Sequence, residues 1–200
     1  MLEVDFVNIK NMVASLEAKG EWNSAIDLLH TAWKANQNDV NITIAFIGES
    51  YWLIKERDYI EYMSESARPI GWSQITWDFQ DKMINVLKYG LDKFHECSWF
   101  LGSIGYLWTT DPIPFLESGR PYSYGMELLQ SACALDPDNP LYLLFWDNNK
   151  FAQSAFSLEL VKQKVDSLIL RDTWFDVNLL DLIVKRLHAS GFDVDWEVPM

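Results

Sequence analysis

The stretch Gly125-Met-Glu-Leu-Leu-Gln-Ser-Ala-Cys-Ala-Leu-Asp-Pro-Asp-Asn-Pro140 predicts a helix that ends in a short polar turn. Its small and apolar residues recur at helical spacing, and Asp136 to Asn139 then interrupt that spacing. Pro140 suits the first turn of a following helix, because the N–H group that proline lacks has no partner there. Helix, tight turn and helix together form the unit of repeat proteins, which are binding scaffolds.

An earlier stretch, Lys19-Gly-Glu-Trp-Asn-Ser-Ala-Ile-Asp-Leu-Leu-His-Thr-Ala-Trp33, has the same spacing of small residues and leucines. The two stretches are offset by 100 residues, which is close to three periods of about 34 residues. This offset indicates a repeat relation between them. The matched pairs are Ala25 with Gly125, Leu29 with Leu129, and Ala32 with Ala132.

Both stretches resemble the second helix of a tetratricopeptide (TPR) repeat. The resemblance rests on the turn Gly20-Glu-Trp22, on the small residues just listed, and on the exit Leu135-Asp-Pro-Asp-Asn139. Two units are recognisable, at about 6–39 and 120–146. The resemblance implies a groove for binding, lined by the first helix of each pair, and no catalytic activity. Gln37 stands where the family has proline, and the 109–121 loop breaks the period, so we expect an irregular stack.

The spacing of apolar residues predicts helices along most of the chain. The first hairpin has helices over 6–16 and from Trp22, joined at Gly20, because glycine favours a turn. A second, degenerate hairpin is expected over 40–67, with Lys55-Glu-Arg-Asp58 as its polar turn. We therefore predict an all-α fold, an irregular TPR-like stack of antiparallel hairpins.

Further along, Ser73 is a candidate N-cap for the next helix, and helical spacing continues over 91–108. Residues 109–121 form a long loop rich in Pro and Gly, and long loops in compact domains are often functional or disordered. A last helix is expected after Asp176, closed by Gly191. These elements place one helical domain over 1–191.

The tail 192–200 has a different pattern, because Phe192 to Val198 alternate between apolar and acidic residues. Such alternation is typical of a strand rather than a helix. An isolated strand leaves its backbone groups without partners. The tail is therefore expected to lie along the helices, to pair with a partner, or to stay mobile.

Composition restricts the possible ligands. The chain has 200 residues and a net charge of −13, which argues against direct binding to nucleic acid, because that binding depends on Lys and Arg at the phosphates. A basic protein is the expected partner, and the alternative is that the acids only keep the protein soluble.

Cys97 and Cys133 are the two cysteines of the chain, and they form no CxxC pair, which fits a reducing cytosol. The first residues lack the basic region of a signal peptide, and the longest uncharged run, 97–110, is too short to span a membrane.

Residues that carry chemistry are sparse. His30, His95 and His188 have no second ligand at metal-binding spacing. Cys97 and Cys133 lie within apolar helical patterns, where thiols are usually inert. Phosphate-binding glycine loops are absent from the sequence. We therefore expect no metal, no cofactor and no enzymatic activity, with a cysteine-dependent enzyme as the alternative.

Charge and aromatic residues gather between Asp111 and Asp147, where six acids stand against the single base Arg120, a net charge of −5. Acids attract a basic partner at long range, and loop aromatics can anchor the contact. A solvated repeat edge is the alternative. The predicted partner-binding residues are Trp108, Asp111, Glu117, Tyr122, Tyr124, Asp136, Asp138, Trp146 and Asp147.

These observations predict a cytoplasmic, non-catalytic protein that binds one basic protein partner. An acidic, aromatic surface on decayed repeats suits an inhibitor or immunity protein that neutralises a basic toxin, for example a nuclease. The second hypothesis is a TPR-type chaperone or adaptor that cradles an extended peptide. The two hypotheses differ in whether the partner is folded or disordered before it binds.

Overall fold

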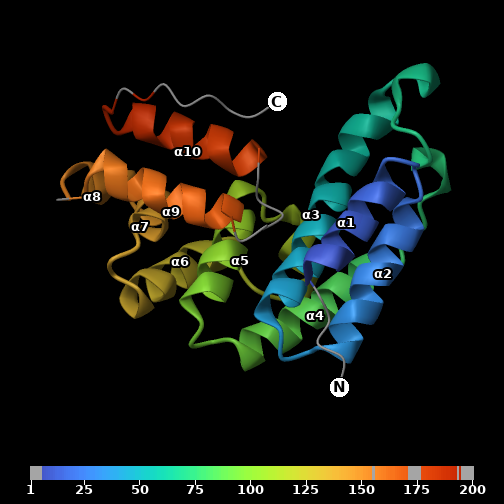
Figure 1. The fold of residues 1–200 in the computed structure, drawn as a ribbon, viewed down its shortest axis with the longest axis horizontal. Helices are drawn as coiled ribbons and strands as arrows, with labels where there is room; N and C mark the ends of the chain where they lie inside the picture. The colour runs from blue at the N-terminus through green and yellow to red at the C-terminus, as the bar shows by residue number, and fades with distance from the viewer. Residues whose placement is uncertain (1–5, 155, 171–176, 193, 195–200) are drawn as a thin grey trace. The chain divides into compact units, whose positions relative to one another are not determined.

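Helices form the regular structure of the computed structural model, which describes residues 6–154, 156–170, 177–192 and 194 (Figure 1). Within those ranges there is no strand, so the prediction of an all-α fold is confirmed. The chain divides into two compact units, one of Met1–Phe94 with Asp111–Arg120 and one of His95–Thr110 with Pro121–Met200. The TPR-like stacking and the single domain over 1–191 stay predictions.

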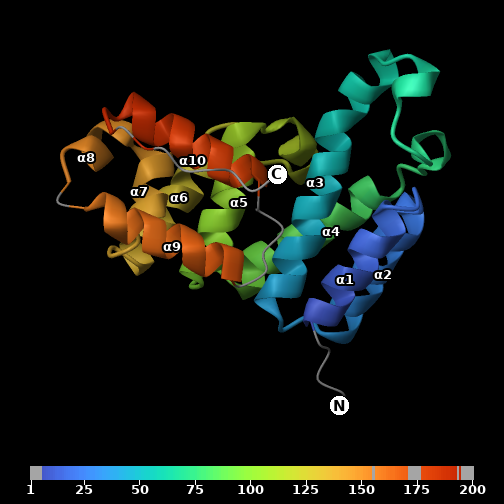
Figure 2. The same cartoon turned by 45° about the horizontal axis from the view of Figure 1, so that its top comes forward.

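The first unit opens with the predicted hairpin. Its two helices, α1 and α2, pack against each other, and Gly20 makes the turn between them at a φ of 75°, which favours glycine. Figure 2 shows α3 running beside this pair. The elements of this unit are α1 (Phe6–Glu17), α2 (Trp22–Ala35), α3 (Val40–Tyr62), α4 (Phe79–Lys93) and the 3₁₀ helices η1 (Glu65–Ala67), η2 (Trp72–Gln74) and η3 (Ile113–Ser118).

The continuous helix α3 corrects the second hairpin. It begins at Val40, after the N-cap Asp39, whose carboxylate accepts hydrogen bonds from the N–H groups of Asn41 at 2.8 Å and Ile42 at 3.3 Å. It then runs to Tyr62 without a break. The predicted turn Lys55–Asp58 is therefore wrong, and so is the hairpin over 40–67. These four residues include neither Gly nor Pro, so their polarity marks a helix surface and not a turn.

Two helix boundaries between 73 and 108 also differ from prediction. Ser73 lies inside η2 rather than at an N-cap, and α4 begins only at Phe79. Helix α4 passes through Gly90 and ends at Lys93, so the predicted helix over 91–108 is interrupted before Ser98. Most of the displacement follows from burial: Trp72 and Ile75 are buried, which holds the segment before α4 against the unit.

The 109–121 segment contains the 3₁₀ helix η3, and its residues Asp111–Arg120 belong to the first unit. Phe115 is fully buried there and stacks on Tyr51 of α3, with ring centroids 5.4 Å apart. Because a buried aromatic ring contributes much apolar contact area, this pair anchors the loop. The segment that is rich in Pro and Gly is thus partly helical, and Phe115 belongs to the core.

The second unit contains the helix and polar turn predicted for residues 125–140. Helix α6 ends at Leu135, and Asn139 caps α7 by accepting a hydrogen bond from the N–H of Leu141 at 3.2 Å. Pro140 occupies the first position of α7. This confirms the predicted helix, turn and helix. The elements are α5 (Ser98–Thr110), α6 (Tyr124–Leu135), α7 (Pro140–Trp146), α8 (Asn148–Ala152), α9 (Leu158–Leu170) and α10 (Val177–Ala189).

Helices α5 and α6 pack backbone against backbone. A Cβ atom on Gly105 would lie 2.9 Å from the carbonyl oxygen of Gly125, and one on Gly125 would lie 2.7 Å from the Cβ of Trp108. Both distances are shorter than normal van der Waals contact. Position 125 therefore requires a small residue, because the two helices cross so closely there. The repeat comparison likewise matches Gly125 with a small residue, Ala25.

The chain's end lies mostly outside the described residues. The predicted strand over Phe192 to Val198 falls largely on 193 and 195–200, and the predicted cap Asp176 also falls outside the described residues. Helix α10 ends before Gly191, which has a φ of 85°, as predicted. Val194 is buried, and its carbonyl oxygen accepts a hydrogen bond from His188 Nε2 at 3.1 Å.

Replacing Gly125 with Ala should destabilise the protein by about 1–3 kcal/mol, because the added methyl group overpacks the α5–α6 crossing. Urea unfolding followed by circular dichroism measures this change. Gly48→Ala is the control within a helix, since a Cβ at Gly48 would meet no atom within 4 Å. It should raise stability by about 1 kcal/mol through helix propensity. Equal stability of the two variants would contradict the crossing.

Candidate functional site

The predicted partner-binding residues are divided between the two units. Asp111 and Glu117 belong to the first unit, and the other seven belong to the second. Asp111 has a structural task, because its carboxylate accepts a hydrogen bond from the N–H of Ile113 at 3.0 Å at the start of η3. Glu117 is exposed. The larger part of the candidate site must therefore be sought in the second unit.

Trp108 is not a surface residue, which corrects its inclusion in the binding set. Its side chain is fully buried, although the residue stands near the start of the long loop. The ring of Tyr124 meets it edge-on, with centroids 5.3 Å apart. Trp108 thus belongs to the core of the α5–α6 pair, because the close crossing leaves no room for it to face solvent. Tyr124 is half-buried through the same contact.

Trp146 and Asp147 share one base from their own unit. The ammonium group of Lys150 lies 4.3 Å from the ring centroid of Trp146 and 3.7 Å from the carboxylate of Asp147. The backbone N–H of Lys150 also donates to Asp147 at 3.0 Å. Both side chains are half-buried. They therefore offer a partner less charge and less aromatic surface than the sequence suggests.

Helix α6 and the turns on either side of it keep exposed charge and exposed apolar surface. Leu128, Leu129 and Ala132 turn into the core, so the opposite side of the helix faces solvent. Tyr122, just before the helix, is 63% exposed. We define the α6 face as five exposed residues: Tyr122 before the helix, Met126, Glu127 and Leu135 on it, and Asp138 in its exit turn.

Two members of the α6 face, Met126 and Leu135, are absent from the predicted set. Helical spacing does not single them out, because Met126 stands three residues before Leu129 and Leu135 seven residues after Leu128, so they border the buried side of α6 on its two edges. Their exposure in the folded structure identifies them. Glu127 is one of the six acids between Asp111 and Asp147, but the predicted set does not include it. Of the predicted residues, the structure places Tyr122 and Asp138 on this face. Asp136 is half-buried in the exit turn, where it accepts a hydrogen bond from Asn139 Nδ2 at 3.3 Å.

The electrostatics of the α6 face have one sign. Residues 121–149 contain four acids and neither Lys nor Arg. Arg120 precedes this stretch and Lys150 follows it, and Lys150 is held by Trp146 and Asp147. Exposed apolar side chains between unpaired carboxylates form a surface that would attract a basic protein and then pack against it.

The groups that an enzyme could use show little activation. Burial raises the pKa of the Cys133 thiol to about 11, and a backbone hydrogen bond and then the charge of Lys150 offset only part of this rise. Burial and then the charges of Lys34 and Lys82 lower the pKa of His30, which stacks between the rings of Trp33 and Phe46. Among the described residues, no group of three or more His, Cys, Asp or Glu side chains could hold a metal ion.

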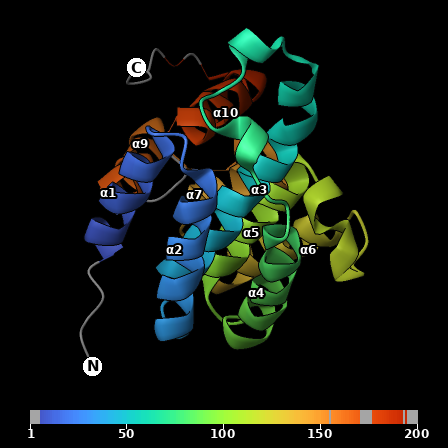
Figure 3. The same cartoon turned by 90° about the vertical axis from the view of Figure 1, so that its right-hand side faces the viewer.

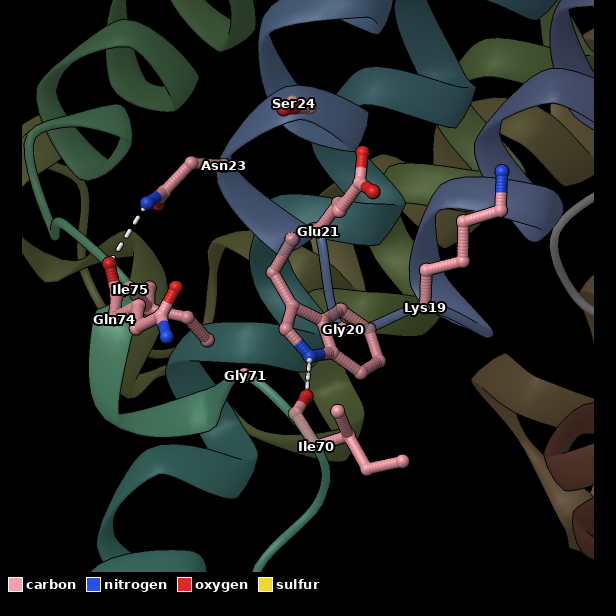
Figure 4. A pocket seen from close by; sticks show the side chains of 10 residues that line it. Lys19, Gly20, Glu21, Asn23, Ser24, Ile70, Gly71, Gln74 and Ile75 are labelled. Atoms are coloured by element: carbon pink, nitrogen blue, oxygen red, sulfur yellow. Dashed lines mark hydrogen bonds between the residues drawn. The ribbon is translucent and has the colours of Figure 1, made fainter.

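A cavity of about 310 Å³ lies in the first unit between the α1–α2 turn and residues 70–75 (Figure 4). Its polar groups largely satisfy one another: Trp22 Nε1 donates to the Ile70 carbonyl and Asn23 Nδ2 to the Gln74 carbonyl, both at 2.8 Å. A Cβ on Gly71 would overlap the Gly20 carbonyl. The cavity therefore lies where two backbone segments pack closely and are joined by hydrogen bonds.

A pair of carboxyl groups joins α1 to α3 in the same unit. Glu49 is only 9% exposed and shares a hydrogen bond with Glu17, whose Oε1 is buried without a hydrogen-bond partner. Burial, followed by the charge of Glu17, raises the pKa of Glu49 well above its usual range. Burial also raises the pKa of Glu17, and the hydrogen bond to Glu49 opposes that rise. A single proton shared between the two carboxyl groups explains how both can lie in this buried position.

Comparison of the chain with protein-family models, with curated proteins and with solved structures finds no match. Within the part of the chain that the structure describes, no helix has the length and apolar character needed to cross a membrane.

The Glu17–Glu49 pair should make stability fall as pH rises. Because the folded-state pKa of Glu49 is raised above its usual value of 4.5, its contribution is fully present below that value. The contribution is lost as pH rises toward the folded-state pKa, by about 1.4 kcal/mol for each pH unit crossed. Glu49→Gln keeps a hydrogen-bonding group that does not titrate, so it should flatten the profile. Urea unfolding between pH 5 and 9 measures this, and an unchanged slope in the variant would exclude the pair as its cause.

Cys133 should react slowly with iodoacetamide in the native protein. A pKa near 11 in place of the usual 9.0 leaves about 100-fold less thiolate at neutral pH. The rate should rise about tenfold per pH unit up to that value. The measurement uses a Cys97→Ser background and mass spectrometry, with the urea-unfolded chain as reference. Native labelling as fast as unfolded labelling would show an activated thiol and would favour the cysteine-dependent enzyme.

Proposed function

We propose that this protein binds a basic protein partner through the α6 face and acts without catalysis of its own. The observation that carries the proposal is the exposure of Tyr122, Met126 and Leu135, which lie before α6 and at the edges of its buried side, together with the exposed carboxylates of Glu127 and Asp138. The surrounding stretch 121–149 includes no Lys or Arg. Such a surface gains little for folding, because its apolar side chains stay in contact with water.

Association would use the two kinds of side chain differently. Glu127 and Asp138 raise the rate of encounter with a positively charged surface, an effect that salt screens. Tyr122 and its apolar neighbours then become desolvated at contact, and a buried tyrosine at the centre of an interface can contribute about 2 kcal/mol or more. Rapid encounter followed by slow release is what a neutralising protein requires.

The partner that we propose is a basic toxin, for example a nuclease, with this protein as its inhibitor or immunity protein. A nuclease has Lys and Arg at its surface to hold phosphates. An acidic face with apolar anchors would cover that surface and exclude the nucleic acid. The net charge of −13 for the whole chain favours this electrostatic match over long distances.

Charge reversal on the α6 face tests the proposal. Glu127→Lys with Asp138→Lys should weaken binding at least about tenfold at about 50 mM salt, and the difference from wild type should shrink at about 500 mM salt. The partner is first captured on immobilised wild-type protein from the native host and identified by mass spectrometry. Its affinity for each variant is then measured by calorimetry.

The matched control is Asp81→Lys with Glu96→Lys, which changes the net charge equally at two exposed positions outside the α6 face. The control should bind almost as tightly as wild type. Equal weakening in both double variants would show that only overall charge matters and would remove the α6 face from the proposal. A captured partner that is disordered when free would favour the chaperone hypothesis instead.

A further inference from the structure

Three tyrosines are exposed among the described residues: Tyr59 at 65%, Tyr62 at 89% and Tyr122 at 63%. Tyr122 belongs to the α6 face. Tyr59 and Tyr62 are three residues apart near the end of α3, so they lie on the same side of that helix. Figures 2 and 3 show this end of α3 extending beyond the ends of α1 and α2.

The acids around these two tyrosines face solvent. Glu61 lies between them on α3, and Glu65 follows in η1, and both are exposed. We define the α3 tip as Tyr59, Glu61, Tyr62 and Glu65. Its rings and carboxylates are close in sequence and contribute nothing to the apolar core.

The bases of the same segment are directed to groups within the unit. Lys55 lies 4.4 Å from the ring centroid of Trp52, and Arg57 lies 5.3 Å from that of Trp77. Arg68 donates hydrogen bonds to two backbone carbonyls at the end of α3, those of Glu61 at 2.8 Å and Met63 at 3.3 Å. Positive charge therefore packs against the protein while the exposed carboxylates face outward.

We propose that the α3 tip is a second contact surface, which binds Lys and Arg side chains of a basic protein partner. A guanidinium or ammonium group can lie over a tyrosine ring and pair with a neighbouring carboxylate at once. The inference rests on the proposed function for the class of partner, but on different residues in the other unit. Like the α6 face, the α3 tip combines exposed tyrosine with exposed acid.

Fluorine NMR of protein labelled with 3-fluorotyrosine tests the α3 tip directly. Each of the eight tyrosines gives one signal, assigned by single Tyr→Phe variants. The probe is a synthetic octapeptide of alternating Lys and Arg with blocked ends, and the control probe is the matching peptide of Glu and Ser. At about 50 mM salt the basic peptide should shift the Tyr59 and Tyr62 signals in a saturable manner, and the shifts should fall at least about threefold at about 500 mM salt.

Two charge-matched double variants locate the effect. Glu61→Gln with Glu65→Gln should reduce the Tyr59 and Tyr62 shifts at least about threefold, whereas Glu127→Gln with Asp138→Asn should leave them unchanged. Absence of saturable shifts at Tyr59 and Tyr62, or equal reduction by both double variants, would overturn the proposal. Circular dichroism of each variant confirms that the helices are retained.

The signal of Tyr122 separates this inference from the proposed function. If Tyr122 responds to the basic peptide while Tyr59 and Tyr62 do not, the α3 tip is excluded and the α6 face is upheld. If only Tyr59 and Tyr62 respond, the α3 tip is upheld and the α6 face loses its support. If none of the three responds, both surfaces are rejected as sites for basic side chains.

Discussion

The backbone-to-backbone crossing of α5 and α6 determines what the second unit presents to solvent. Gly105 and Gly125 allow the two helices to approach until a Cβ on either would collide with the other. Because the helices are so close, one side of α6 is buried in the core, and so is Trp108 of α5. The opposite side is then exposed by geometry, whatever its composition. The exposed carboxylate of Glu127 on that side is therefore a feature that folding does not explain.

The first unit depends on a comparable constraint at a different place. Gly20 and Gly71 let two turns cross at their backbones, and Trp22 and Asn23 fix the crossing with hydrogen bonds to the carbonyls of Ile70 and Gln74. The buried Glu17–Glu49 pair works against stability, because burial disfavours its charged form. A unit that keeps such a pair must be stabilised elsewhere, and the aromatic contact of Phe115 with α3 is one such source.

Sequence reasoning predicted the elements in which periodicity and punctuation agree. The α1–α2 hairpin and the α6–α7 pair have apolar spacing, glycine or proline at their ends, and small residues at the crossings. The predicted helix boundaries are wrong where only one of these signals is present. Lys55–Asp58 is polar but includes no helix-breaking residue, so α3 continues through it. At Ser73, the burial of Trp72 and Ile75 displaced a helix start that the capping residue favoured. Tertiary contacts of this kind cannot be deduced from local spacing.

The candidate site shows the same division between local and tertiary information. Tyr122 and Asp138 could be found from charge and loop position, whereas Met126 and Leu135 border the buried side of α6 and are identified only by their exposure in the folded structure. The burial of Trp108 and the capture of Lys150 by Trp146 and Asp147 depend on the folded arrangement. Aromatic content was therefore a poor guide on its own, because rings such as Trp108 and Phe115 serve the core. What distinguishes a binding surface is the pairing of an exposed ring with a carboxylate that no nearby base neutralises, and this pairing occurs in both units.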